Sequence, residues 1–206
     1  MSEHNTGMND DAVARFAHPN YVLRRKLLTV LGAKFHIYAP DGDLALFAKL
    51  KALKLREDIR LYADEAQTRE LLRIGTKSII DFSGAYDVFD SETEERLGTL
   101  RRKGMKSSFL RDEWLILDAE GNEFGKIVEE SMFKAIARRL YDGLAFFMPQ
   151  KYEAFIGDQV VASYRQHFNP IVQKIAIDFS HDPQGRLDPR LGLAAAVLLC
   201  AVEGRQ

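Results

Sequence analysis

The chain has 206 residues, 46% of them hydrophobic, so it can form one large domain or two small ones around a sizeable core. Its formal net charge of −1 argues against a general nucleic-acid binder, because such proteins usually carry a basic excess. A single cysteine, Cys200, excludes a disulfide framework within the chain and fits a reducing compartment. The first residues lack the apolar core of a signal peptide, so we expect a cytoplasmic protein.

The N-terminal part of the chain carries little structural signal. Residues 1–20 are polar and mixed and have no hydrophobic period, which predicts a loose tail. Residues 21–28 are compatible with a short helix or with an extended lead-in, and the pattern leaves both open. We therefore expect one domain over residues 21–206, preceded by the tail.

From residue 34 the sequence changes to short strand-like runs separated by turns. Residues 40–43, which contain Pro, Asp and Gly, predict a hairpin turn. A slip in the alternation at Ala52 and Leu53 predicts a bulge. About twelve strands are predicted, at residues 35–38, 44–50, 59–62, 69–74, 78–82, 86–90, 96–100, 114–118, 123–127, 152–156, 160–166 and 171–179.

A weak internal repeat lies within these strands. Residues 86–100 resemble residues 114–127, since each copy has an aromatic-led strand, an aspartate that opens the turn and a glycine in the return strand. An aspartate at the start of a turn accepts hydrogen bonds from the local backbone. A glycine inside a strand predicts a bend or a close approach of another backbone.

Two helices are predicted, and they differ in kind. Residues 131–144 form an amphipathic pattern, with an apolar face opposite Lys134 and Arg138. Residues 189–203 form the second helix, which is apolar on all sides from residue 191 to residue 202, with Asp188 as the N-cap, Pro189 at the first helical position and Gly204 as the C-terminal stop.

The apolar helix organises the predicted fold. A membrane span needs about 20 apolar residues, which is more than this run offers, and an oligomerisation helix would usually keep a polar face. A helix that is apolar all round is buried all round. We therefore predict a mainly β fold: a closed antiparallel barrel of about twelve strands around a central hydrophobic C-terminal helix, plus one amphipathic helix.

Residues 21–206 also resemble the LURP-one-related family, which shares its fold with the C-terminal domain of Tubby proteins and with phospholipid scramblases. The resemblance is carried by the order of several short stretches: YAPDG at 38–42, LYADE at 61–65, IDF at 80–82, DVFD at 87–90, GTLRRK at 98–103, RDEW at 111–114, FNP at 168–170 and the closing helix. It covers roughly 90% of the chain, and no single stretch is specific. It implies the same closed twelve-stranded barrel around a helix. Tubby domains bind phosphoinositides and scramblases act at membranes, but a shared fold does not confer a function.

The main candidate for a binding site is a basic run. Arg forks match phosphate oxygens, so these residues are candidates for an anionic headgroup, although basic residues at a strand edge can also serve only to keep it solvated. A helix with a basic face can lie on a membrane surface or pack on a barrel mouth. The candidate residues are Arg101, Arg102, Lys103, Lys106 and Arg111 in the run, and Lys134 and Arg138 on the helix.

Motifs for catalysis or metal binding are missing from the sequence. No pair of histidines has the spacing of a metal site, and no CxxC, GxSxG, Walker or Rossmann pattern occurs. Adjacent acidic residues on a strand point to opposite faces and make poor acid–base pairs. We expect no cofactor, no metal, no transmembrane span and no nucleic-acid partner. The expected function is a non-enzymatic binding or scaffold protein with an anionic membrane lipid or a protein as partner; the alternatives are an enzyme with a loop-built site at a barrel mouth and a scramblase-like membrane-associated protein.

Overall fold

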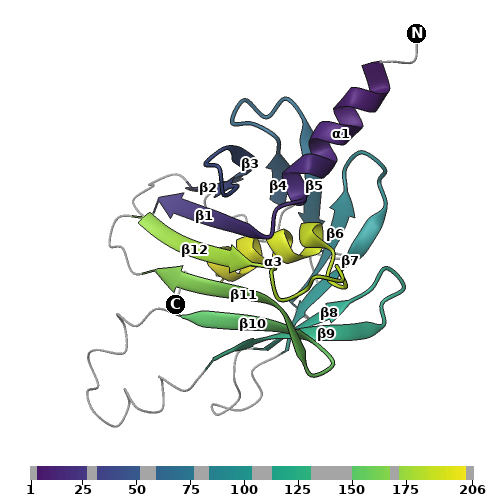
Figure 1. Ribbon diagram of the computed structural model, residues 1–206, viewed down its shortest axis with the longest axis vertical. Helices are drawn as coiled ribbons and strands as arrows, with labels where there is room; N and C mark the ends of the chain where they lie inside the picture. The colour runs from purple at the N-terminus through teal and green to yellow at the C-terminus, as the bar shows by residue number, and fades with distance from the viewer. Residues whose placement is uncertain are drawn as a thin grey trace.

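The computed structural model describes residues 4–26, 32–51, 59–76, 84–103, 113–130, 150–167 and 172–202. Figure 1 shows the arrangement of their helices and strands. The elements are α1 (His4–Phe16), β1 (Asn20–Lys26), β2 (Gly32–Tyr38), β3 (Leu44–Lys51), β4 (Ile59–Tyr62), β5 (Glu70–Gly75), β6 (Ala85–Asp90), β7 (Arg96–Arg102), β8 (Glu113–Leu117), β9 (Glu123–Glu129), β10 (Lys151–Ile156), β11 (Gln159–His167), β12 (Val172–Asp178) and α3 (Pro189–Val202).

The strands form one closed antiparallel barrel. Each strand pairs with its neighbours in the sequence, and β1 closes the barrel against β12 with Asn20 opposite Asp178 and Lys26 opposite Val172. Closure leaves no strand edge free among the described strands, which removes the usual template for aggregation. The predicted fold class is confirmed.

The strand assignment differs from the sequence prediction in one place. The segment left open between helix and extended lead-in is strand β1, whose residues Tyr21 and Leu23 face the core and are fully buried. The other predicted strands in the described ranges match the observed ones closely. The predicted strand at 78–82, the bulge at Ala52 and Leu53, the helix at 131–144 and the stop at Gly204 lie outside the described residues.

Helix α3 fills the barrel, as predicted. All its residues from Leu191 to Ala201 are buried, including the small ones that face the wall at close range. The cap is also confirmed, since the Asp188 carboxylate accepts a hydrogen bond from the Arg190 amide at 2.8 Å. The helix therefore belongs to the hydrophobic core, and Cys200 on it is fully buried.

The glycines of the internal repeat and of the helix mark close approaches. A Cβ on Gly98 would lie 2.5 Å from the Leu117 carbonyl oxygen, and one on Gly125 would lie 2.7 Å from the Phe155 carbonyl oxygen. The repeat thus places a glycine at the same kind of tight strand contact in both copies, as its sequence indicated.

The N-terminal residues differ from the loose tail that we expected, because residues 4–16 form helix α1. The Arg15 guanidinium anchors this helix by donating hydrogen bonds to the carbonyl oxygens of Leu44, Ala45 and Ala63 at 3.0, 3.3 and 3.0 Å. The Tyr21 hydroxyl donates to the Arg15 carbonyl at 3.0 Å. Beyond this anchor the helix extends away from the barrel (Figure 1). Because the partners of Arg15 are distant in the sequence, the local pattern of residues 4–16 does not predict this anchor.

The barrel has two distinct ends. At the turn end, short turns join β2 to β3, β4 to β5, β6 to β7, β8 to β9 and β10 to β11, and helix α3 begins. The remaining connections, at residues 27–31, 52–58, 77–83, 104–112, 131–149 and 168–171, lie outside the described residues. Candidate sites in the described part of the chain are therefore the turn end, the barrel interior and the outer wall.

Candidate functional site

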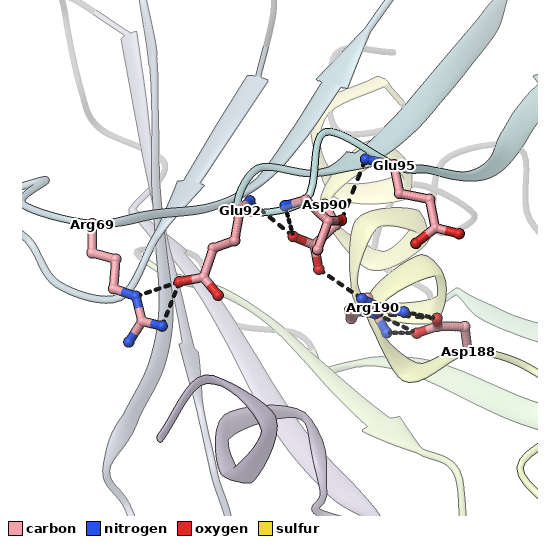
Figure 2. Close-up of polar contacts among 7 residues, drawn as sticks. Arg69, Asp90, Glu92, Glu95, Asp188 and Arg190 are labelled. Atoms are coloured by element: carbon pink, nitrogen blue, oxygen red, sulfur yellow. Dashed lines mark hydrogen bonds and ion pairs between the residues drawn. The ribbon is translucent and has the colours of Figure 1, made fainter. Parts of the chain in front are cut away.

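The turn end carries a network of charged residues around the start of α3 (Figure 2). Arg190 donates to the Asp90 carboxylate at 2.7 Å and to the Asp188 carboxylate at 2.6 Å. The hydrogen bond and charge of Asp188, with a smaller contribution from Asp90, raise the pKa of Arg190. Beside it, Arg69 donates to the Glu92 carboxylate at 2.7 Å. Each of these charges has an opposite partner, so the network works as a clamp between α3 and the β6–β7 turn.

The turn carboxylates serve the local backbone. Asp90 accepts from the amides of Glu92 and Thr93 at 2.8 and 3.1 Å, and Asp118 accepts from the amide of Asn122 at 2.8 Å. Hydrogen bonds from the Asn122 side chain and amide lower the pKa of Asp118. Asp118 is therefore a poor proton donor, and both aspartates use their carboxylate oxygens to hold their own turns, which is a structural role.

Inside the barrel, a small polar group surrounds the end of α3. Arg25 lies opposite Gln173 in the β1–β12 ladder and donates to the Cys200 carbonyl oxygen at 2.8 Å. A cation at this position satisfies a terminal carbonyl and opposes the negative end of the helix dipole. The Cys200 thiol donates to the Gln173 amide oxygen at 3.2 Å. Burial raises the pKa of Cys200 to about 12, so the thiolate that a nucleophile needs is disfavoured.

The residues of the predicted basic run do not share one surface in the described part of the chain. Alternation along β7 places Arg101 on the outer wall, opposite Leu115, and Arg102 on the same face as Trp114, which belongs to the core. Lys103 is exposed and forms an ion pair with Glu113 at 3.1 Å. Lys106, Arg111, Lys134 and Arg138 lie outside the described residues.

The histidines form no metal site in the described ranges. His36 lies 3.1 Å from the Glu65 carboxylate and stacks on the Tyr38 ring with a centroid separation of 6.1 Å. His181 lies 3.9 Å from Asp178. Within the part of the chain that the structure describes, no three His, Cys, Asp or Glu side chains are placed to hold a metal ion together.

A second basic surface, which sequence reasoning missed, covers the outer wall of five neighbouring strands. We call it the cationic face. Its residues point outward because each is flanked along its strand by core residues such as Leu23, Phe35 and Ile175. The ladders place Arg24 opposite Lys174, and Lys34 opposite Lys49. The cationic face consists of Arg165 on β11, Lys174 on β12, Arg24 on β1, Lys34 on β2 and Lys49 on β3.

The five cations of this face have no ion-pair partner among the described residues, although Arg24 lies over the Tyr38 ring at 4.8 Å. Elsewhere on the described surface most cations are paired. Examples are Arg60 with Glu70 at 2.7 Å, Arg73 with Glu94 at 3.0 Å, and Lys151 with Glu130 and Glu153 at 2.9 and 2.8 Å. The unpaired positive charge is therefore concentrated on one side of a chain with a net charge of −1.

Acidic residues are nearly absent from the cationic face. At the described outward positions of these five strands, the acidic residue is Asp178, and it lies at the turn end of β12. Glu65 reaches the face from the β4–β5 turn and contacts His36. His167 extends the face, because it lies opposite Lys174. The sequence signal for this surface is the pattern of lysine and arginine at alternate positions in five separate strands.

The comparisons with known proteins bear on the fold. The structure is similar to the X-ray structure of a protein from Arabidopsis thaliana, with a TM-score of 0.50 and 13% sequence identity over 92% of this chain and 95% of the other. No family model matches the sequence, and no curated protein matches it. The protein is thus a closed twelve-stranded barrel around a helix, and the Arabidopsis protein is a solved structure with a similar fold.

Among the described residues, neither α1 nor α3 has the combination of length and hydropathy needed to cross a membrane.

Proposed function

We propose that this protein is a non-enzymatic binding or scaffold protein of the LURP-one-related kind that binds anionic membrane surfaces peripherally. The observation that carries the proposal is the cationic face, on which five outward cations lack acidic partners among the described residues. Unpaired cations on an exposed wall are free to neutralise anionic headgroups without first breaking an ion pair.

The expected affinity is modest. Each basic residue near an anionic membrane contributes about 1 kcal/mol, so five contribute about 5 kcal/mol, equivalent to a dissociation constant on the order of 0.2 mM. Such binding is reversible and sensitive to salt, because the Debye length is about 8 Å at physiological ionic strength and shorter above it. The protein would therefore associate with a membrane through accumulated charge, without inserting a segment.

The basic run that begins at Arg101 is the second candidate for this surface. Arg101 is on the outer wall, and Lys126 lies in the same lateral row through Leu115, with no ion-pair partner for either among the described residues. With Lys103 these residues form a second basic group on β7 and β9, while Lys106, Lys134 and Arg138 lie outside the described residues. In the closed strand order β7 is as far as possible from β1, so a flat membrane can meet only one of the two surfaces at a time.

Vesicle co-sedimentation distinguishes the two surfaces. The first variant combines Arg24→Ser, Lys34→Ser and Lys174→Ser, and the matched control combines Arg101→Ser, Lys103→Ser and Lys126→Ser, which changes the net charge equally. We expect the wild-type protein to sediment with phosphatidylserine-containing vesicles and not with pure phosphatidylcholine vesicles. The first variant should lose most of this binding and the control should keep it.

The opposite pattern would transfer the proposal to the β7 surface. Equal recovery on neutral and anionic vesicles would reject recognition of anionic headgroups, and no recovery on either would reject membrane binding and leave a protein-binding barrel. Circular dichroism of all three proteins establishes that the comparison is made between folded chains.

A further inference from the structure

The spacing of the charges on the cationic face says what kind of anion it fits. The face runs from β11 through β12, β1 and β2 to β3, and β11, β12 and β1 lie side by side in Figure 1. Four interstrand steps of about 4.8 Å make it ~19 Å wide. A site for a single phosphate gathers several donors within hydrogen-bond distance of one group. Charges spread over this width cannot all reach one headgroup.

The two guanidinium groups of the face are also separated. Arg165 lies in the row of Ala176 and Val22, two strands away from Arg24 and two residues along. The strand spacings put their backbones ~12 Å apart. Arg24 is in addition held over the Tyr38 ring, with 4.8 Å between its Cζ atom and the ring centroid. The pair is therefore not placed to bind one phosphate as a double fork.

The curvature of the barrel wall also disfavours a site for a single phosphate. The outer wall of a barrel is convex, so its side chains diverge, whereas phosphate sites are concave nests of backbone and side-chain donors. A twelve-stranded barrel has a radius of ~12 Å, so the outer strands of the face lie about 6 Å behind β1. The Debye length of about 8 Å at physiological ionic strength is longer than this step, so the charges of Lys49 on β3 and Arg165 on β11 still act on a membrane that touches β1. An extended, nearly flat anionic surface can thus attract all five cations.

The aromatic residues near the cations favour a membrane over single-stranded nucleic acid. Binding of unpaired bases uses exposed aromatic rings as stacking platforms. Here Tyr38 is stacked with His36 and covered by Arg24, and Phe47 is fully buried. The rings nearest to the cations are therefore already occupied by protein groups.

We infer that the cationic face responds to the charge density of an anionic bilayer and does not select a particular headgroup. This inference rests on the proposed function and narrows its ligand to a diffuse anionic lipid surface. Phosphatidylserine, phosphatidylglycerol and phosphorylated inositol lipids are then equivalent once their surface charge is matched. A soluble inositol phosphate or inorganic phosphate offers no extended surface and does not replace the bilayer.

The test measures co-sedimentation with three sets of phosphatidylcholine vesicles that carry phosphatidylserine, phosphatidylglycerol or phosphatidylinositol bisphosphate at equal total charge. We expect recoveries that agree within about twofold, and no release by inositol hexakisphosphate at constant ionic strength. Single replacements Arg24→Ser, Lys34→Ser, Lys49→Ser, Arg165→Ser and Lys174→Ser should each weaken binding by a similar factor of about fivefold, since each removes about one equal charge contribution.

Several results would overturn the inference. A tenfold preference for the bisphosphate lipid, release by inositol hexakisphosphate, or one replacement that abolishes binding while the other four have no effect would each indicate a single-headgroup site. Tighter binding to a single-stranded oligonucleotide than to any vesicle would assign the face to nucleic acid. Absence of binding to every vesicle is a different outcome, because it rejects the proposed function itself.

Discussion

The close packing of α3 against the barrel predicts a conditional effect of replacing Gly192 by alanine. A Cβ at this position would lie 2.5 Å from Cε1 and 2.7 Å from Cζ of Phe179. The ring is held edge-on against Tyr21, with a centroid separation of 6.1 Å, so it cannot move without disturbing the core. Overpacking of this kind costs about 1–3 kcal/mol, whereas glycine to alanine in a helix interior gains about 1 kcal/mol. We expect Gly192→Ala to lower the free energy of unfolding by ~1 kcal/mol.

The effect should change sign when the ring is shortened. Phe179→Leu removes the two ring atoms that the new methyl group would meet, so only the gain in helix propensity remains. In the Phe179→Leu background, Gly192→Ala should therefore raise the free energy of unfolding by about 1 kcal/mol. The loss caused by Phe179→Leu itself is common to both members of that pair and cancels in the cycle.

Urea unfolding of the four proteins, followed by circular dichroism and by the fluorescence of Trp114, gives the coupling energy. The dependence of the free energy on urea concentration should be the same for all four, which shows that the unfolded states are comparable. A coupling of about 2 kcal/mol is expected. If Gly192→Ala has the same effect in both backgrounds, the ring of Phe179 does not limit the space beside the helix, and the reasoning is refuted.

Three further outcomes are expected. Leu198→Asp should prevent folding, since Leu198 is buried inside the barrel and the new charge would have no partner. The control Leu198→Met should fold. A cooperative urea transition for the aspartate variant would contradict the interior position of Leu198. Arg15→Ala should destabilise the anchor of α1 by about 1–3 kcal/mol, because three carbonyl oxygens lose a charged donor. Hydrogen exchange should become faster in α1 but not in α3. Unchanged exchange in α1 would argue against the anchor. Burial raises the pKa of Cys200 from its usual 9.0 to about 12, so below pH 9 the thiol is protonated in both states, and above it the unfolded state loses its proton first. Stability should then fall by ~1.4 kcal/mol per pH unit between pH 9 and 12, and Cys200→Ala should reduce the slope of free energy against pH by that amount.

The interior helix and the class of fold were predictable from the sequence. The stretch from Leu191 to Ala201 has no polar face, which on elementary grounds requires burial on all sides, and Asp188 with Pro189 marks its start. Strands with strict alternation, such as β12, were equally clear. In these segments local pattern and tertiary environment agree, so each could be assigned without the rest of the chain.

Strand β1 was not predictable from its pattern, because Arg25 breaks the alternation. Its side chain points inward, where it is stabilised by the Cys200 carbonyl oxygen and by the Phe35 ring at 5.6 Å. Both partners are distant in the sequence. A charged residue at an inward position argues against a strand unless its partner at the end of α3 is known. Helix α1 is a similar case, since it depends on the anchor that Arg15 makes to two turns.

The cationic face was missed for a different reason. Basic residues that are adjacent in the chain are easily recognised, as in the run that contains Arg101 and Arg102. Neighbours on a strand point to opposite faces, so the described part of that run is divided between the outer wall and the barrel interior. Residues that share a wall come from separate strands, as Arg24 and Lys174 do. The hydrogen-bond register decides which residues of separate strands become neighbours on the barrel wall, and the sequence alone does not give this register.

The closure of β1 on β12 has a consequence for biosynthesis. The ribosome produces all twelve strands before it produces α3, the helix that occupies their interior. Until α3 emerges the inward faces of the strands lack their filling, and until β12 emerges β1 lacks the partner that removes its free edge. Contacts between distant parts of a chain form slowly, and exposed edges and apolar surface favour aggregation meanwhile. Nascent chains that stop before Pro189 should therefore need a chaperone, while emergence of α3 should switch the whole chain at once into a protease-resistant state.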